Sequence, residues 1–285
     1  MKYAFMTQQR SLWPVRWMCQ ALGVSASGFY EWLVRPESER ALANRIALAR
    51  IRESFEASDK TYGSPRVWRD LRRWDVSCSE NRVARLMRAA GIVARRRRRR
   101  PPFDAGDRSV IAPNVLDRQF EATAPNQKWV ADFTCVWTDE GWLYIAVVLD
   151  LYSRLVVGWS MQKQMTAELV TDALLMAIWR RRPKDAALLH HSDQGSQYTS
   201  EHFQRLLTDN GIQCSMSRSG NCWDNAAMES FFSTLKTERM SRKYYRRRDE
   251  AKADAFDFIE RFYNTRRMHS TLDYLSPAAF EKLRA

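Results

Sequence analysis

Cysteine is scarce in this chain of 285 residues, and the few cysteines form no pattern. There are five, an odd number, and no two of them are spaced as C-x-x-C. A disulfide framework would need an even set, and a structural zinc site would need closely spaced ligand pairs. The sequence therefore argues against both, and we expect reduced thiols of the kind found in cytosolic proteins.

Long apolar runs are missing as well. Residues 1–10 contain no apolar signal core, and no run approaches the roughly 18 residues that suggest a membrane span. A heptad repeat long enough for a coiled coil is also absent. Because 45% of the residues are nevertheless hydrophobic, a packed core is expected. The sequence thus predicts a soluble, intracellular protein without a membrane partner, built as one large domain or two to three small ones.

Acidic residues are outnumbered only in the first third of the chain. Residues 1–100 contain 22 Lys and Arg against 9 Asp and Glu, whereas residues 101–285 contain 24 of each kind. The whole net charge of +13 therefore belongs to the first hundred residues. Such an asymmetry favours a front part that binds a polyanion and a back part with different chemistry.

A short helical pattern opens the basic front part. Residues 12–34 predict two short helices around Gly23-Val24-Ser25, with Ser25 as the cap of the second helix. This is a small helix-turn-helix pattern that favours DNA contact. A helical hairpin that only packs would give the same pattern, because such short patterns are common by chance.

Residues 39–94 predict three further helices. Leu42 and Ile46 are expected on the buried face of the first, and Ser64 and Pro65 suit the N-cap and first turn of the second. A run of charge is usually a solvated helix face, but so many arginines with few acids on two short helices favour nucleic-acid binding. The outward residues of the second and third helices include Arg66, Arg69, Arg72, Arg73, Arg82, Arg85 and Arg88.

Six consecutive arginines follow these helices and end at Pro101-Pro102. They are Arg95, Arg96, Arg97, Arg98, Arg99 and Arg100. Like charges repel and extend the chain, so this stretch is expected to be a mobile linker rather than a packed element. Its contact with DNA phosphates would be independent of sequence and sensitive to salt, because binding releases counterions.

The rest of the sequence predicts an α/β unit. Strand patterns at residues 129–137, 142–151 and 155–161 come first, and the pattern then alternates helix, strand, helix, strand, helix up to residue 240. Among the α/β folds that this periodicity allows, the order fits the RNase H-like fold. The sequence accordingly predicts a helix-turn-helix-like segment at 1–38, a DNA-binding domain at 39–94, a basic linker at 95–125, the α/β core at 126–240 and a helical extension at 241–285.

Three carboxylates of the α/β unit lie where a metal site is possible. Asp132 and Asp193 each follow an apolar run that predicts a strand, and Glu229 lies on a predicted helix with 35 residues between it and Asp193. Mg²⁺ takes oxygen ligands, and two ions about 3.5–4 Å apart can hold the attacking and leaving oxygens of a phosphoryl transfer. A single Asp at a strand end more often caps a turn, but the three together favour a two-ion site.

The stretches around these acids are more specific than the acids alone. They read Trp129-Val130-Ala131-Asp132-Phe133-Thr134, His191-Ser192-Asp193-Gln194-Gly195-Ser196-Gln197-Tyr198 and Asp224-Asn225-Ala226-Ala227-Met228-Glu229-Ser230-Phe231-Phe232. A fourth stretch, Tyr263-Asn264-Thr265-Arg266-Arg267-Met268-His269-Ser270-Thr271-Leu272, is called the tail motif below. Together they resemble the second-frame (orfB) protein of the IS-three family of insertion sequences. The three acids resemble the catalytic triad of DDE transposases and retroviral integrases, and the resemblance covers nearly all of the chain.

This resemblance implies a DNA transposase with an RNase H-like integrase catalytic core and a helix-turn-helix-like N-terminal DNA-binding region. The expected cofactor is Mg²⁺, two ions per active site with Mn²⁺ as a substitute. Asp132 and Asp193 are expected to share one ion, and Asp132 and Glu229 the other. The expected partner is double-stranded DNA of the element ends and the target, bound by a homo-oligomer in the nucleoid of a bacterial cytoplasm.

Other possibilities stay open at this point. The family commonly fuses this frame to an upstream one by frameshifting, and the missing heptad repeat leaves open whether the chain acts alone. A non-catalytic DNA-binding regulator on an integrase-like scaffold would share the fold, although the intact acids argue against it. A structure-specific nuclease would share the acids, although the separate basic front part argues against that.

Neighbouring residues have expected roles too. Lys236 shares a helix face with Glu229, as in the family, and is expected to reach a DNA phosphate. Asn225 points the same way and is expected to bond a base edge or a phosphate. In the loop after Asp193, which includes Gln194, Gly195 permits close backbone approach to DNA and Tyr198 is expected to stack on a flipped base. His190 and His191 are expected to pack or to contact DNA rather than to bind metal, because Mg²⁺ prefers oxygen ligands. Trp223, Phe231 and Phe232 are expected in the core rather than stacked on DNA.

Overall fold

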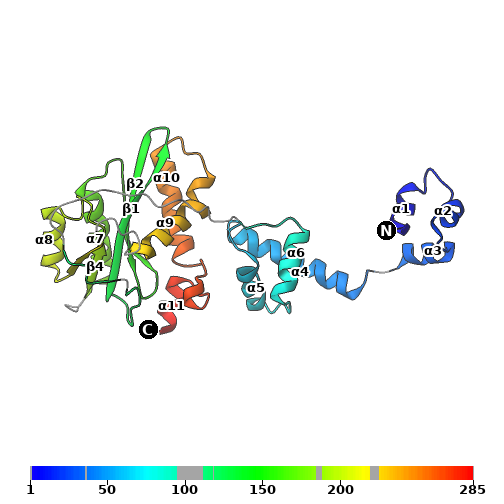
Figure 1. Ribbon diagram of the computed structural model, residues 1–285, viewed down its shortest axis with the longest axis horizontal. Coiled ribbons are helices and arrows are strands. Elements are labelled where there is room, and N and C mark those ends of the chain that lie inside the picture. Colours follow the sequence, from blue (N-terminus) through cyan, green and yellow to red (C-terminus); the bar gives the residue numbers. More distant parts are fainter. Residues whose placement is uncertain are drawn as a thin grey trace.

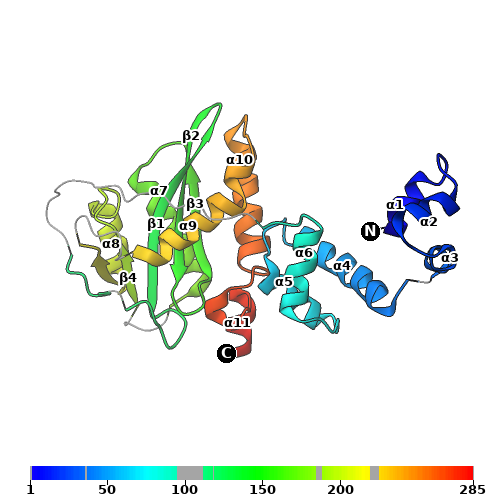
Figure 2. The same cartoon turned by 45° about the vertical axis from the view of Figure 1, so that its right-hand side comes forward.

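Two helical units precede the α/β unit in the computed structural model, which describes residues 2–35, 37–94, 112–117, 119–183, 188–218 and 225–284 (Figure 1). The first unit consists of α1 (Lys2–Gln9), α2 (Val15–Leu22) and α3 (Ala26–Val34) around the buried side chains of Met6, Met18, Cys19 and Phe29. Ser25 caps α3 as predicted, since its Oγ accepts a hydrogen bond from Gly28 N at 3.0 Å. Helix α1 was not predicted, because it buries only Met6 and so shows little periodicity. Both views show this unit standing apart from the rest (Figures 1 and 2).

The second unit consists of α4 (Glu39–Ala57), α5 (Ser64–Arg73) and α6 (Glu80–Ala89). The prediction that Leu42 and Ile46 are buried is wrong, because they are 42% and 55% exposed. The buried residues of α4 are Ala47, Ile51, Ser54 and Phe55. Ser64 is the first residue of α5 rather than its N-cap, which is Gly63, while Pro65 lies in the first turn as predicted.

A five-stranded mixed sheet forms the centre of the α/β unit. Its strands are β1 (Lys128–Thr138), β2 (Gly141–Asp150), β3 (Val156–Gln162), β4 (Leu189–Ser192) and β5 (Gln213–Met216). The order across the sheet is β3-β2-β1-β4-β5, with the first three strands antiparallel and β4 and β5 parallel to β1. This arrangement confirms the predicted α/β fold of the integrase, RNase H-like type.

Helices cover both faces of the sheet. Trp129 and Ala131 pack with α7 (Ala167–Arg181) and α8 (Glu201–Asp209), whereas Val130 packs with α9 (Ala226–Glu238) and with the segment after it. Successive residues of a strand point to opposite faces. Asp132 therefore lies on the same face as Val130, the one that α9 crosses in Figure 2.

The chain after α9 runs through η2 (Met240–Arg242), α10 (Arg248–Phe256), a π-helical segment η3 (Asp257–Tyr263), η4 (Ser270–Leu272) and α11 (Pro277–Arg284). In α10 the side chain of Phe256 is 42% exposed, so the large aromatic residue does not mark the buried face. The buried residues instead recur about every four positions, at Ala251, Ala255, Ile259 and Tyr263. The wider turn of a π-helix accounts for this spacing in its second half.

The tail motif attaches this segment to the sheet and to α4–α6. Asn264 bonds both backbone groups of Val156, accepting from its N–H and donating to its C=O, each at 3.0 Å. Tyr62 Oη accepts from Met268 N and donates to Arg266 O, both at 3.1 Å. Through these contacts α4–α6 dock on the C-terminal segment. In the part of the chain described here, no helix combines the length and apolarity needed to cross a membrane.

Candidate active site and nucleic-acid interface

Asp132 lies partly buried on β1, where the negative charges of the other two predicted acids act on its carboxyl group. The pKa of its carboxyl is raised to about 8, first by removal from water and then by the negative charge of Asp193, with a smaller contribution from Glu229. The N–H of Phe133, 2.7 Å from Oδ1, and the charge of Lys236 oppose this rise. The fold thus brings Asp132, Asp193 and Glu229 into one electrostatic neighbourhood together with Lys236.

Asp193 lies immediately after β4, in a loop that its own hydrogen bonds shape. Its Oδ1 accepts from the N–H of Gly195 at 2.9 Å. A Cβ at Gly195 would lie only 3.0 Å from Asp193 Oδ1 and 3.0 Å from Gln197 Oε1, so a side chain there would press on the carboxylate. Gln194 donates to Ser217 O at 2.6 Å and ties the loop to the end of β5. Gln194 and Gly195 therefore support Asp193, and their predicted contact with DNA stays a prediction.

Helix α9 contributes the third acid and the basic residue. Glu229 is exposed in the first turn, and Lys236 lies seven residues further on the same face. Asn225 forms the N-cap of α9, and its Nδ2 donates to the carbonyl of Ala131 at 3.3 Å. This bond ties the start of α9 to the residue before Asp132. The side chain is only 7% exposed, which contradicts the prediction that Asn225 bonds DNA, because it is committed to β1.

The chemistry of the three acids fits divalent cations. All are hard oxygen donors, and the pKa of Asp132 is raised by burial and then by the charge of Asp193, a repulsion that a doubly charged cation would offset. Among the described residues, however, no three His, Cys, Asp or Glu side chains are already arranged to hold a metal ion. The fold therefore supplies the donors on one face of the sheet, and closure of the acids around ions stays a prediction.

Tyr198 does not have the role predicted for it. Its ring is 1% exposed and packs edge-on against Phe203 at 5.3 Å between ring centroids. Burial raises the pKa of its hydroxyl well above the usual value. Because neither face of the ring is open, stacking on a flipped base is contradicted by the structure. The sequence could not exclude it, since an aromatic residue in a loop gives no sign of the core beneath.

The two histidines of β4 pack, as predicted. His191 Nδ1 lies 2.9 Å from Ser215 Oγ, and the ring of His190 packs against Phe203 at 5.4 Å. Phe231 and Phe232 are also buried, at 2% and 7% exposure, which confirms their place in the core. Trp223 lies outside the described residues.

His190 makes the stability of the fold depend on pH. Burial lowers its pKa to about 3, and neither ring nitrogen has a hydrogen-bond partner among the described residues. The unfolded chain takes up this proton near pH 6.5 while the folded one does not, so stability falls as the pH drops below 6.5. Between pH 7 and pH 4.5 we expect the free energy of unfolding of His190→Phe to fall by about 2 kcal/mol less than that of the parent.

Urea denaturation at several pH values measures this effect. His202→Phe, a change at an exposed histidine of α8, is the matched control and should leave the pH slope as in the parent. The pKa of His269 is lowered to about 2, so this residue contributes the same pH dependence of stability in all three proteins. Parallel pH profiles for His190→Phe and the parent would contradict the assignment.

Arg66, Arg69 and Arg73 of α5 contact other parts of the protein, although Arg72 and Arg73 are exposed. Arg66 is 22% exposed at its side chain and lies 3.8 Å from Glu238. The guanidinium of Arg69 stacks 4.0 Å from the ring centre of Tyr274, and Arg73 donates to Tyr274 O at 3.1 Å. The C-terminal segment therefore covers part of this helix face, and the contact of its arginines with DNA stays a prediction.

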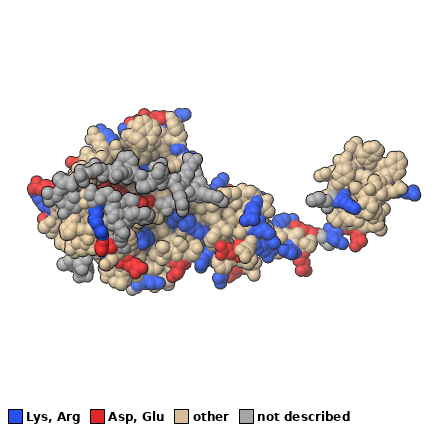
Figure 3. Space-filling view, in the orientation of Figure 1, with Lys and Arg blue, Asp and Glu red and all other residues tan. Residues whose placement is uncertain are grey.

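Other basic residues remain candidates for DNA contact. Arg82 bonds Asn44 Oδ1 at 2.9 Å, whereas Arg85 is exposed on α6. Figure 3 shows basic side chains gathered over the α4–α6 unit and at its junction with the α/β unit. The predicted contacts at Arg95–Arg100 lie outside the described residues. The exposed arginines of the α4–α6 unit are therefore the described candidates for contact with DNA.

Known proteins resemble this chain along nearly its whole length. The Integrase core domain profile matches residues 122–222, a second profile of the same description matches residues 210–277, and the HTH-like domain profile matches residues 41–100. The transposase InsF of insertion sequence IS3A from Escherichia coli (strain K12) is 39% identical over 285 residues, covering 99% of this chain and 98% of that protein. The chain belongs to the IS3 family of transposases.

Two further proteins are similar to this IS3-family transposase. An uncharacterized 31 kDa protein of insertion element IS600 from Shigella sonnei is 41% identical over 266 residues, 93% of this chain and 97% of that one. The catalytic core domain of HTLV-2 integrase, solved in complex with magnesium, is 21% identical with a TM-score of 0.43, covering 56% of this chain and 98% of that chain. Family membership makes the transposase a polynucleotidyl transferase of the DDE type that acts on DNA.

Proposed function

We propose that this transposase cleaves phosphodiester bonds at the ends of an insertion sequence and joins the resulting 3′-hydroxyl to DNA. Asp132, Asp193 and Glu229 would hold two divalent ions, Mg²⁺ with Mn²⁺ as a substitute. When bound, such a pair activates the attacking oxygen and stabilises the leaving one. The observation that carries the proposal is the coupling of Asp132 to both other acids on the sheet face beside α9.

The residues around the acids would orient them and the DNA. The bond from Asn225 to Ala131 O fixes the start of α9 against β1, and so aims Glu229 at Asp132. The N–H of Gly195 donates to Oδ1 of Asp193, which would orient this carboxylate for an ion. Lys236, whose positive charge lowers the pKa of Asp132, would form an ion pair with a phosphate of the bound strand.

The proposal includes the partners and the division of labour along the chain. Double-stranded DNA of the element ends and the target would lie over the acids and along Arg85 and Arg95–Arg100. The units at 1–38, 39–94, 126–240 and 241–285 would have different tasks, with the predicted linker at 95–125 between the second and the third. A homo-oligomer would hold two DNA ends together, and an upstream-frame protein fused by frameshifting would complete it.

Removal of divalent ions tests the chemistry directly. The protein is mixed with labelled DNA carrying an element end, and cleavage and joining are followed with EDTA, Mg²⁺ or Mn²⁺. We expect EDTA to slow both reactions by about a thousandfold or more, while DNA binding persists and either ion restores activity. Cleavage at an unchanged rate in EDTA would overturn the two-ion proposal. Binding without cleavage under any ion would favour the non-catalytic regulator instead.

A further inference from the structure

A cavity of about 340 Å³ lies beside α9, and its described lining does not include Asp132, Asp193 or Glu229. Ser230 and Thr234 of α9 line it, and at about 100° per residue they lie on a different side of the helix from Glu229 and Lys236. Five residues of the tail motif line it as well, namely Tyr263, Arg267, His269, Ser270 and Thr271. The most specific stretch outside the candidate active site therefore builds this cavity.

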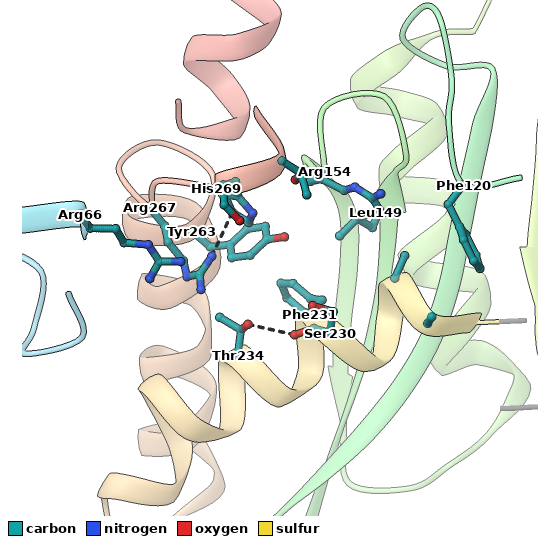
Figure 4. A pocket seen from close by; sticks show the side chains of 14 residues that line it. Arg66, Phe120, Leu149, Arg154, Ser230, Phe231, Thr234, Tyr263, Arg267 and His269 are labelled. Atoms are coloured by element: carbon teal, nitrogen blue, oxygen red, sulfur yellow. Dashed lines mark hydrogen bonds between the residues drawn. The ribbon is translucent and has the colours of Figure 1, made fainter. Parts of the chain in front are cut away.

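Three arginines enter the cavity from different parts of the chain. Figure 4 shows Arg66 reaching in from α5, Arg154 from the turn between β2 and β3, and Arg267 from the segment after η3. Among the described residues that line the cavity there is no carboxylate, and Glu238 pairs with Arg66 and Arg267. His269 stays neutral, because burial and then the three arginines lower its pKa to about 2. The lining therefore has an excess of positive charge.

Arg267 has a structural partner. Its guanidinium makes a two-point ion pair with Glu238, with both distances 2.7 Å, and the same carboxylate lies 3.8 Å from Arg66. One carboxylate thus serves two arginines. This arrangement holds α5 against the tail motif but leaves the third arginine unmatched.

Arg154 has no such partner. It is half-buried, and its guanidinium makes no hydrogen bond or ion pair with any described residue. Its backbone is also in the left-handed region, at φ 60°, which is unfavourable for a residue with a Cβ. A desolvated charge without a counter-ion and a strained backbone each destabilise the free protein. Because both unfavourable effects fall on Arg154, they suggest that its guanidinium is placed to bind a ligand.

We infer that this cavity binds a phosphate group, with Arg154 as its principal ligand and Ser230, Ser270 and Thr271 as hydroxyl donors. Arginine matches phosphate because its planar fork donates two parallel hydrogen bonds. The cavity volume equals that of about ten water molecules, which leaves room for a sugar attached to the phosphate. The phosphate belongs either to a DNA backbone, which rests on the proposed function, or to a free phosphate compound.

Two binding measurements on the full chain in EDTA test this inference without the metal chemistry. The first compares the melting temperature in inorganic phosphate with that in chloride at equal ionic strength. Arg154→Asn removes the charge, and asparagine tolerates the left-handed backbone. We expect phosphate to raise the melting temperature of the parent by about 2–4 °C more than that of Arg154→Asn. Arg154→Lys should recover part of the gain, and Arg261→Gln, a change at an exposed arginine of η3, should behave as the parent.

The second measurement identifies the source of the phosphate. Binding of a duplex without element ends is followed against salt concentration. If the source is DNA, Arg154→Asn binds roughly tenfold more weakly and the slope of log K against log salt falls by about 0.9. Unchanged DNA binding together with a lost phosphate response identifies a free phosphate compound. An equal response of the parent and Arg154→Asn to inorganic phosphate overturns the inference, whatever the duplex shows.

Discussion

Replacing Asp193 by asparagine is expected to abolish end cleavage and strand joining while DNA binding persists. Asparagine keeps the size of the side chain, and its oxygen can still accept the 2.9 Å bond from Gly195 N, so the loop remains folded. The substitution removes the negative charge that the proposed ions need. Losing several kcal/mol of transition-state stabilisation corresponds to about a thousandfold or more in rate. Glu229→Gln on α9 should have the same effect.

The measurement follows cleavage and joining of labelled element ends in Mg²⁺, with binding to the same DNA in parallel. Asp209→Asn is the matched control, because Asp209 is an exposed acid at the end of α8. It should leave all three activities unchanged. Joining at a near-parental rate by Asp193→Asn or Glu229→Gln would remove the metal-site assignment.

The same substitution should make the ion-free protein no less stable. Asp193 raises the pKa of Asp132 by like-charge repulsion, so its neutralisation brings that pKa down and relieves the repulsion. In EDTA the variant should melt at or above the temperature of the parent, whereas Mg²⁺ should raise only the melting temperature of the parent. Loss of function with equal or better stability is typical of residues placed for chemistry rather than for folding.

The sequence predicted that Asp132, Asp193 and Glu229 lie near one another, because local rules govern the position of each acid. Apolar runs end at Asp132 and Asp193, and strand alternation puts both on one face once β1 and β4 pair in parallel. Helical spacing then aligns Glu229 with Lys236. The same periodicity predicted nearly every helix and strand. It missed α1, whose single buried residue leaves no pattern.

The contacts of α5 could not be inferred, because a basic helix face has the same pattern whether DNA or protein covers it. Arg69 stacks on Tyr274, about two hundred residues away in the chain, and nothing in the spacing of either residue encodes that meeting. The predicted contacts of Tyr198 and Asn225 with DNA were wrong for a related reason. A polar or aromatic side chain near an acid suggests a ligand contact, but burial depends on packing that only the assembled sheet defines.

Adding one methyl group at Gly158 is expected to destabilise the fold strongly. Gly158 lies on β3 under α7, where a Cβ would lie 2.1 Å from the carbonyl oxygen of Ala173 and 2.8 Å from Ala177 N. Both are backbone atoms, so no side-chain rotation can make room. We expect Gly158→Ala to lower the free energy of unfolding by about 3 kcal/mol or more, roughly a 10 °C fall in melting temperature.

Two further variants separate this steric cause from a general effect of replacing glycine. Gly63→Ala is the control, because a Cβ there meets only ordinary contacts at 3.8 and 3.9 Å, and it should change stability by no more than about 1 kcal/mol. Ala177→Gly removes the Cβ that lies 2.9 Å from the added methyl group but leaves the Ala173 carbonyl in place. Combined with Gly158→Ala it should therefore recover little. Full recovery in the double variant would show that α7 is held off β3 by side chains and not by its backbone.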